Sequence, residues 1–271
     1  TGTNTSSNGN IATTITSGVN IPGGTTSSDA KVVDVVAPIW QKVSSTANVS
    51  AANAEDQSAT VIFKGTDTYY ASNSLNANNI EVWVDGVKVT LGFTKTLSAA
   101  TELKEQRKEF GKTTTVEKQY GVQYTLTIRG FSEEMKQVKI RIPENTLTDE
   151  SGNTNASSEI MVYNSLVSSQ ADSLLTDDST DSEANKDAGF LGNTSIKRQN
   201  IEQVIFEKSI PSSVAYNTTT GKYGNSTAWD VSAMKDKSII AWYDTNTTTG
   251  ALKVHIASDY EIFANRLSGY L

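Results

Sequence analysis

Two groups of acidic residues have the side chains and spacing that could bind a cation. Asp149 lies in a Thr-Asp-Glu-Ser-Gly-Asn segment that ends at Asn153, and the second group contains Asp177, Asp178 and Asp181. Carboxylate and amide oxygens are the ligands that calcium prefers, but neither group has the spacing of an EF-hand loop. Asp and Asn also cap β-turns by accepting hydrogen bonds from nearby amides. Turn capping is therefore the main interpretation of Asp149, and calcium binding is the alternative.

A nucleophilic triad would have to use His255, which is the single histidine of the chain. The alternation of residues 252–256 places His255 on the same strand face as Lys253, opposite Val254 and Ile256. This pattern predicts a solvated strand position. The chain contains no Cys, which excludes disulfides, thiol nucleophiles and Cys-ligated zinc. The sequence therefore predicts no catalytic residue and no enzyme activity.

Three aromatic residues are candidates for stacking on a carbohydrate. Trp83 is expected on the strand face opposite Val82 and Val84, and Tyr69 and Tyr70 lie beside a loop rich in Thr and Asn. A ring face with a polar edge suits a sugar. Packing inside the domain is the main interpretation, because buried area dominates the energetics of aromatic side chains.

Composition excludes several classes of partner. The chain has 271 residues and a net charge of -7, with a pI near 4.9, which argues against nucleic acid. Its apolar runs are too short to cross a bilayer, so we expect no membrane insertion. The chain starts at Thr1 without a signal peptide, and we interpret it as a piece of a longer protein.

Period-2 alternation of apolar residues predicts an all-β fold, with a β-sandwich over residues 36–164. The pair Asp85-Gly86 between two alternating runs predicts a hairpin with a type I′ turn. The charged segment 102–118 is expected to form a solvated hairpin tip or a short helix.

The flanking segments have different compositions. Residues 1–35 are predicted to be a linker, with a strand near residues 11–21 that could be the last strand of a preceding repeat. Residues 165–197 are expected to be an acidic linker. Residues 198–271 are predicted to form a second, small β module, in which the run Val204-Ile205-Phe206, Trp229 and Trp242 are expected to be buried.

Residues 36–163 resemble a bacterial immunoglobulin-like repeat of Gram-positive surface proteins. The resemblance rests on an ordered series of short motifs: Ala37-Pro38, residues 61–64, residues 79–82, residues 124–128, and residues 147–154 with Gly152-Asn153-Thr154. It implies an Ig-like β-sandwich in an extracellular protein.

The second module is similar to the lead-in of BspA-type leucine-rich-repeat surface proteins. The matching words are Ile201-Glu202, Val204-Ile205-Phe206, residues 229–232, residues 238–242, residues 252–256 and residues 264–271. This resemblance implies that leucine-rich repeats follow in the full protein, although the sequence itself contains none.

Both resemblances favour a non-catalytic adhesion or spacer segment at the cell wall or cell surface. Its partners would be a host or cell-surface protein, a glycan, or neighbouring modules of the same chain. No cofactor is expected apart from the calcium alternative. Two rival functions remain open: a carbohydrate-binding module attached to a secreted enzyme, and a subunit of a surface filament or lattice.

Overall fold

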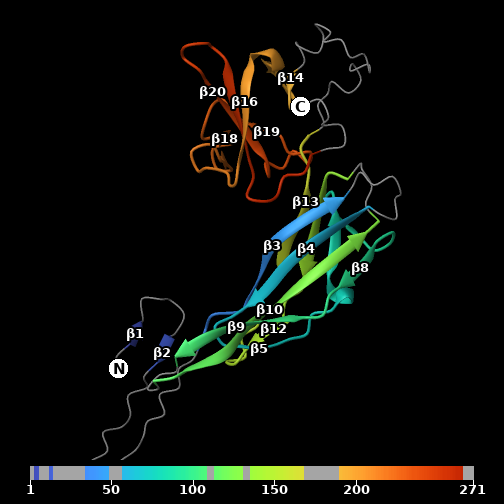
Figure 1. Cartoon of the computed structure of the whole chain (residues 1–271), viewed down its shortest axis with the longest axis vertical. Helices are drawn as coiled ribbons and strands as arrows, with labels where there is room; N and C mark the ends of the chain where they lie inside the picture. The colour runs from blue at the N-terminus through green and yellow to red at the C-terminus, as the bar shows by residue number, and fades with distance from the viewer. Residues whose placement is uncertain are drawn as a thin grey trace, which may run out of the picture.

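The computed structural model describes residues 3–5, 12–14, 34–48, 57–108, 113–130, 135–167 and 189–264. These residues form strands and short 3₁₀ turns, with no α-helix among them, so the prediction of an all-β fold is confirmed. Figure 1 shows a long sandwich with a second unit at one end and the strand pair β1–β2 at the other.

The sandwich consists of two antiparallel sheets that share one core. The first sheet contains β3 (Ile39–Asn48), β4 (Ser58–Thr66), β10 (Thr115–Arg129), β8 (Thr94–Leu97) and β9 (Thr101–Lys108). The second sheet contains β13 (Ser158–Asn164), β11 (Gln137–Ile142), β6 (Glu81–Val84) and β7 (Val87–Val89). A separate pair, β5 (Tyr70–Asn73) and β12 (Leu147–Asp149), closes the end far from the second unit, and a 3₁₀ turn, η2 (Ala77–Asn79), precedes β6.

Alternation of side chains explains why these segments pair as strands. In β4, Ala59, Val61 and Phe63 are buried, whereas the residues between them are half-buried. Phe63 lies 5.5 Å from Trp40 and 6.0 Å from Tyr124, measured between ring centroids, so three aromatic rings fill one end of the core. The Trp40 indole N–H donates to the Thr146 hydroxyl at 2.9 Å, which satisfies its one polar atom.

Two local predictions are confirmed in the sandwich. Asp85 and Gly86 have φ of 49° and 81°, the positive values that a type I′ turn requires, and they join β6 to β7. The charged segment 102–118 forms the arm of a hairpin in which β9 pairs with the first part of β10, and no helix forms among its described residues.

The second unit is a mixed sheet with a hairpin on one side. Its four-stranded sheet has the order β16 (Ile201–Glu207), β21 (Leu252–Ala257), β20 (Ile240–Thr245) and β19 (Trp229–Asp230). The pair β16–β21 is parallel and the other pairs are antiparallel. The remaining elements are β14 (Gly189–Phe190), β15 (Asn193–Lys197), η4 (Arg198–Asn200), β17 (Tyr216–Asn217) and β18 (Lys222–Tyr223).

Three predictions about the second unit and its connector need correction. The unit begins before residue 198, because Phe190, Leu191 and Ile196 belong to its core. The acidic linker also starts later than residue 165, since Leu166 is buried in the same core. The run Val204-Ile205-Phe206 is not buried, and Phe206 is 58% exposed. Trp242 is buried as predicted, and Trp229 is half-buried against the core of the unit.

Near the N-terminus the described residues form one short antiparallel pair. β1 (Thr3–Thr5) pairs with β2 (Ala12–Thr14), so the strand predicted near residues 11–21 has a partner within the first 15 residues of the chain. Most of the predicted linker 1–35 and the second acidic group, Asp177, Asp178 and Asp181, lie outside the described residues.

Candidate metal site and junction between the modules

Three aspartates meet at the end of the sandwich far from the second unit. Asp34 precedes β3, Asp67 follows β4 and Asp149 ends β12, and each offers a carboxylate oxygen within 4.8 Å of the other two. Asp34 and Asp149 are buried, with 5% and 2% exposure, and Asp67 is half-buried. Figure 1 places β5 and β12 at this end.

The loop that carries Asp149 is held from inside by a buried asparagine. The Asn155 side-chain oxygen accepts hydrogen bonds from the backbone amides of Thr146 (2.8 Å) and Leu147 (2.7 Å). Its amide nitrogen donates to the carbonyl oxygens of Pro143 (3.0 Å) and Ala156 (2.8 Å). These four bonds fix both ends of the loop, and with it the start of β12.

Asp149 and Asn153 come together as the sequence predicted, but Asn153 acts through its amide nitrogen. That nitrogen donates to the Asp149 carboxylate at 2.7 Å and to the backbone carbonyl of Asp34 at 2.8 Å. The other Asp149 oxygen accepts from the backbone amides of Ser151 (2.9 Å) and Asn153 (2.7 Å). The capping interpretation of Asp149 therefore holds, and the same side chain also faces two further acids.

Sequence reasoning missed Asp34 and Asp67. Asp34 and Asn153 are 119 positions apart in the chain, so no local motif connects them. The sequence did contain one indication of their role, which is their position relative to the strands. Asp34 lies before β3 and Asp67 follows directly after β4. Strands that pair antiparallel bring such ends to the same pole of a sandwich.

The charges of the cluster are not fully compensated by the protein. Burial raises the pKa of Asp67, the backbone amide of Tyr69 lowers it, and the neighbouring Asp34 and Asp149 raise it further. Arg107 lowers this pKa, but less than the other causes raise it. Three carboxylates around one point supply hard oxygen ligands, which fit a cation such as calcium, with carbonyl oxygens or water completing its about six to eight ligands.

The predicted carbohydrate residues are not assembled into one surface. Tyr70 is buried in the sandwich core, and its hydroxyl accepts from the Asn73 side chain at 2.9 Å. Tyr69 is half-buried beside Asp67. Trp83 lines a separate cavity of about 210 Å³ whose lining includes neither tyrosine, and its indole N–H donates to Glu81 at 3.1 Å. Carbohydrate binding stays a prediction.

His255 is more enclosed than the sequence predicted. Its ring stacks on Trp242 with 5.0 Å between centroids and lies between two acids, at 3.0 Å from Glu207 and 3.4 Å from Asp244. These acids come from the strands on either side of β21, so His255 links three neighbouring strands of the sheet.

The two modules meet in a junction built from backbone as well as side chains. After β13, the chain enters the second unit directly: the Leu166 amide donates to the Phe263 carbonyl, and the Phe263 amide donates to the Asn164 carbonyl, both at 3.0 Å. The Phe263 ring lies 4.9 Å from the Tyr163 ring and packs against the sandwich core. The second unit thus contributes a side chain to the core of the first.

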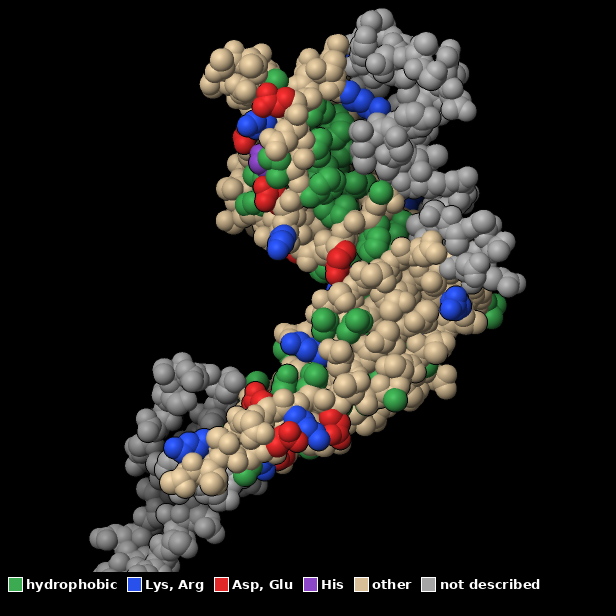
Figure 2. All heavy atoms as spheres, in the orientation of Figure 1, with side chains coloured by type: hydrophobic (Ala, Val, Ile, Leu, Met, Phe, Trp, Pro, Cys, Tyr) green, Lys and Arg blue, Asp and Glu red, His purple; other side chains and the backbone are tan. Residues whose placement is uncertain are grey.

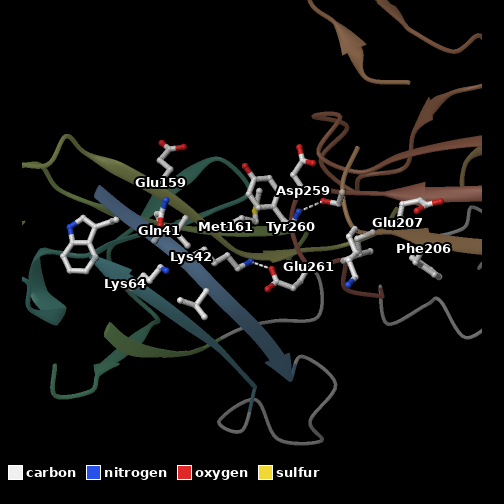
Figure 3. A pocket seen from close by; sticks show the side chains of 16 residues that line it. Gln41, Lys42, Lys64, Glu159, Met161, Phe206, Glu207, Asp259, Tyr260 and Glu261 are labelled. Atoms are coloured by element: carbon white, nitrogen blue, oxygen red, sulfur yellow. Dashed lines mark hydrogen bonds and ion pairs between the residues drawn. The ribbon is translucent and has the colours of Figure 1, made fainter. Parts of the chain in front are cut away.

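Two acids of the second unit complete the junction. Glu261 pairs with Lys42 and accepts from the backbone amide of Ser45 at 3.1 Å, which occupies part of the outer edge of β3. Asp236 accepts from the Gln137 side chain at 2.7 Å. A groove of about 960 Å³ opens beside these contacts (Figure 3), and its lining includes Lys64, Phe206 and the partly exposed Tyr260.

Ionisation of both acids is favoured by these contacts. Burial acts to raise the pKa of Glu261, but the hydrogen bonds from Lys42 and the backbone outweigh it, so its pKa is lowered. For Asp236 burial is again the largest single cause, and the bonds from Ser238 and Gln137 together lower its pKa. Burial lowers the pKa of Lys42, against the raising effect of Glu261.

We expect calcium to stabilise the protein through the aspartate cluster. Because the pKa of Asp67 is raised in the folded state, ionising this carboxyl costs stability, and the cost appears as pH rises through that pKa. In chelator at pH 7, Asp67→Asn should therefore raise the melting temperature. Calcium at 100 times its Kd should stabilise the folded state of the unmodified chain by about 2.7 kcal/mol. This corresponds to a rise of about 5–10 °C in its melting temperature. Differential scanning calorimetry measures both.

The control for this experiment is Glu150→Gln, which removes one negative charge from the same turn at an exposed position outside the cluster. The calcium shift should persist in Glu150→Gln and be largely lost in Asp67→Asn. Equal calcium shifts in the two variants would show that the cluster does not bind the ion.

We expect acid to loosen the junction. The pKa values of Glu261 and Asp236 are lowered in the folded state, so their ionised forms contribute stability at neutral pH. This stability is lost as pH falls from the ordinary carboxyl pKa of about 4 through the lowered values. Small-angle X-ray scattering from about pH 7 to about pH 3 should then show the units separating before the sandwich unfolds. Glu261→Gln should show part of this change at neutral pH, whereas Glu159→Gln, in the groove wall, should not. A profile that is independent of pH until global unfolding would contradict this.

The comparisons with known proteins give no relative: no family model matches the chain, and neither the curated proteins nor the solved structures contain a significant match. Among the described residues, no helix is long and apolar enough to span a membrane.

Proposed function

We propose that this chain is a non-catalytic spacer segment of an extracellular protein, which holds a distal recognition region away from the cell surface. The observation that carries the proposal is the shared core at the junction. Phe263, near the end of the described second unit, packs against the core of the sandwich, and Tyr163 of β13 is its aromatic neighbour.

A spacer must resist bending between its modules, and the junction has the contacts to do so. Ser165 is fully buried there, and its hydroxyl donates to the Lys136 carbonyl at 2.9 Å. Asn164 is also fully buried, and its side chain exchanges hydrogen bonds with the Ser238 hydroxyl at 3.0 and 3.2 Å. Because these polar groups are buried and paired, opening the junction would leave them without partners unless water enters.

The end-to-end arrangement of the two units also suits a spacer. In Figure 1 the second unit and the strand pair β1–β2 lie at opposite ends of the sandwich, so the two units are stacked end to end. The aspartate cluster and the junction likewise lie at opposite poles. Calcium at the cluster would rigidify the pole where residues before β3 enter the sandwich, since Asp34 is one of its three acids.

Removing the Phe263 ring should free the two units from each other. We expect Phe263→Ala to lower the free energy of unfolding by about 2 kcal/mol, somewhat less than the about 3–5 kcal/mol typical of a fully buried Phe. The radius of gyration measured by small-angle scattering should increase, and its distribution should broaden, because the ring no longer anchors the second unit.

Leu91→Ala provides the matched control, because Leu91 is 86% exposed on a sandwich loop. It should change neither the scattering profile nor the stability. An unchanged profile for Phe263→Ala would refute the role of this ring in fixing the two units to each other. Hydrolysis of a polysaccharide by the purified chain would refute the non-catalytic role itself.

A further inference from the structure

The two outer faces of the sandwich carry different side chains. Over β3, β4 and β10, Figure 2 shows mainly uncharged polar side chains and backbone, and the Thr60 and Thr127 hydroxyls lie 3.3 Å apart there. The outer face of the second sheet instead carries Trp83, with Lys88 opposite it on β7 and Lys139 opposite it on β11. The alternate residues of β6 pack in or against the core, so the half-buried indole of Trp83 lies on the outside.

The Trp83 ring is held in place through its one polar atom. Its indole N–H donates to the Glu81 carboxylate at 3.1 Å, and Lys88 forms an ion pair with the same carboxylate. The hydrogen bond from Lys88, and then the one from Trp83, lower the pKa of Glu81, so this carboxylate stays ionised at neutral pH. Because its N–H is occupied, the indole presents apolar ring surface to the cavity of about 210 Å³ that it lines.

Two side chains of opposite charge line the same cavity. They are Lys139, which is half-buried, and Glu159, which is exposed. Within the part of the chain that the structure describes, neither side chain has a hydrogen-bond or ion-pair partner. An ammonium group can only donate hydrogen bonds and a carboxylate can only accept them. A ligand at this place therefore needs groups that do both, as hydroxyl groups do.

The cavity adjoins the groove at the junction, because Glu159 lines both. Met161, which is opposite Lys139 in the β11–β13 register, lines the groove, and so does Tyr260, which is 45% exposed (Figure 3). Neighbouring strands are about 4.8 Å apart, so the backbones of Trp83 and Met161, two strands apart, are about 10 Å from each other. We call the row formed by Trp83, Lys139, Glu159, Met161 and Tyr260 the Trp83 track. It is long enough for several rings of a chain-like ligand.

The charges along the Trp83 track cancel. The linings of the cavity and the groove contain four lysines and four acids, and Lys42 and Glu261 among them are paired with each other. A strongly charged ligand would meet as many like charges as opposite ones, whereas a neutral ligand meets no repulsion. Ligand sites commonly lie between domains and combine aromatic side chains with a few polar groups, as this track does.

We propose that the Trp83 track binds a neutral, linear, β-linked oligosaccharide. One sugar ring stacks its C–H face on Trp83, while its hydroxyls accept a hydrogen bond from Lys139 and donate one to Glu159. The chain continues into the groove, where a further ring stacks on Tyr260. The Lys42 ammonium lies 5.9 Å from the centroid of Tyr260 and contacts one face of that ring, so the ligand uses the other face. A β-linked chain is extended and can follow such a row.

Titration of the full chain with cellopentaose or chitopentaose tests the proposal, because both are neutral and β-1,4-linked. Isothermal titration calorimetry should give a Kd of about 0.1–1 mM. Trp83→Ala should weaken binding about tenfold or more, and Tyr260→Ala should weaken it to a smaller extent. Binding should also change the tryptophan fluorescence. Trp83→Phe keeps a ring and should still bind, but without that fluorescence change, which locates the sugar even if Trp83→Ala misfolds.

Tyr216→Ala is the matched control, because Tyr216 stacks on Tyr223 in the β17–β18 hairpin and lines neither the cavity nor the groove. It should bind both pentasaccharides as the unmodified chain does. A hyaluronan hexasaccharide provides the control for charge, since it is linear and β-linked but anionic. It should bind more weakly than the neutral sugars.

The proposal is overturned if neither pentasaccharide binds at about 10 mM, or if Trp83→Ala or Tyr260→Ala leaves the affinity unchanged. Binding of hyaluronan as tight as that of the neutral sugars would also overturn it. The bound pentasaccharide should be recovered uncleaved, so sugar binding does not conflict with a non-catalytic spacer. The cavity at Trp83 lies wholly within the sandwich, so the result for Trp83→Ala does not depend on the rigidity of the junction. Sugar binding and the spacer function can therefore fail separately.

Discussion

The packing of Phe263 against the sandwich core is the contact on which the arrangement of the whole molecule depends. A polar hinge would let two β units of this size move independently, which is the default for modules joined by a linker. Here the ring of Phe263 lies against Tyr163, and the backbone on both sides of the ring is hydrogen-bonded to residues 164 and 166. The second unit therefore behaves as an extension of β13, and the groove beside it follows from this fixed placement.

The carboxyl groups at the two ends of the sandwich have pKa values shifted in opposite directions. At the junction, Glu261 and Asp236 each receive hydrogen bonds that lower the pKa, so their charges stabilise the folded chain at neutral pH. At the other pole, Asp67 faces two further acids and its pKa is raised, so the folded state is strained by charge unless a cation compensates it. The carboxylates at the junction are thus paired within the protein, whereas the three aspartates at the other pole are compensated only in part.

Local pattern predicted most of the sandwich, and failed where distant segments meet. Alternation found β4, β6, β10 and β11, and Asp85-Gly86 identified its turn, because both signals depend on neighbouring residues. Asp149 and Asn153 were found for the same reason. Asp34, Asp67 and Phe263 were missed, since their roles arise from strand pairing across the chain. The apolar run of β16 was predicted to be buried because hydrophobic composition alone does not say whether a strand is central or at an edge.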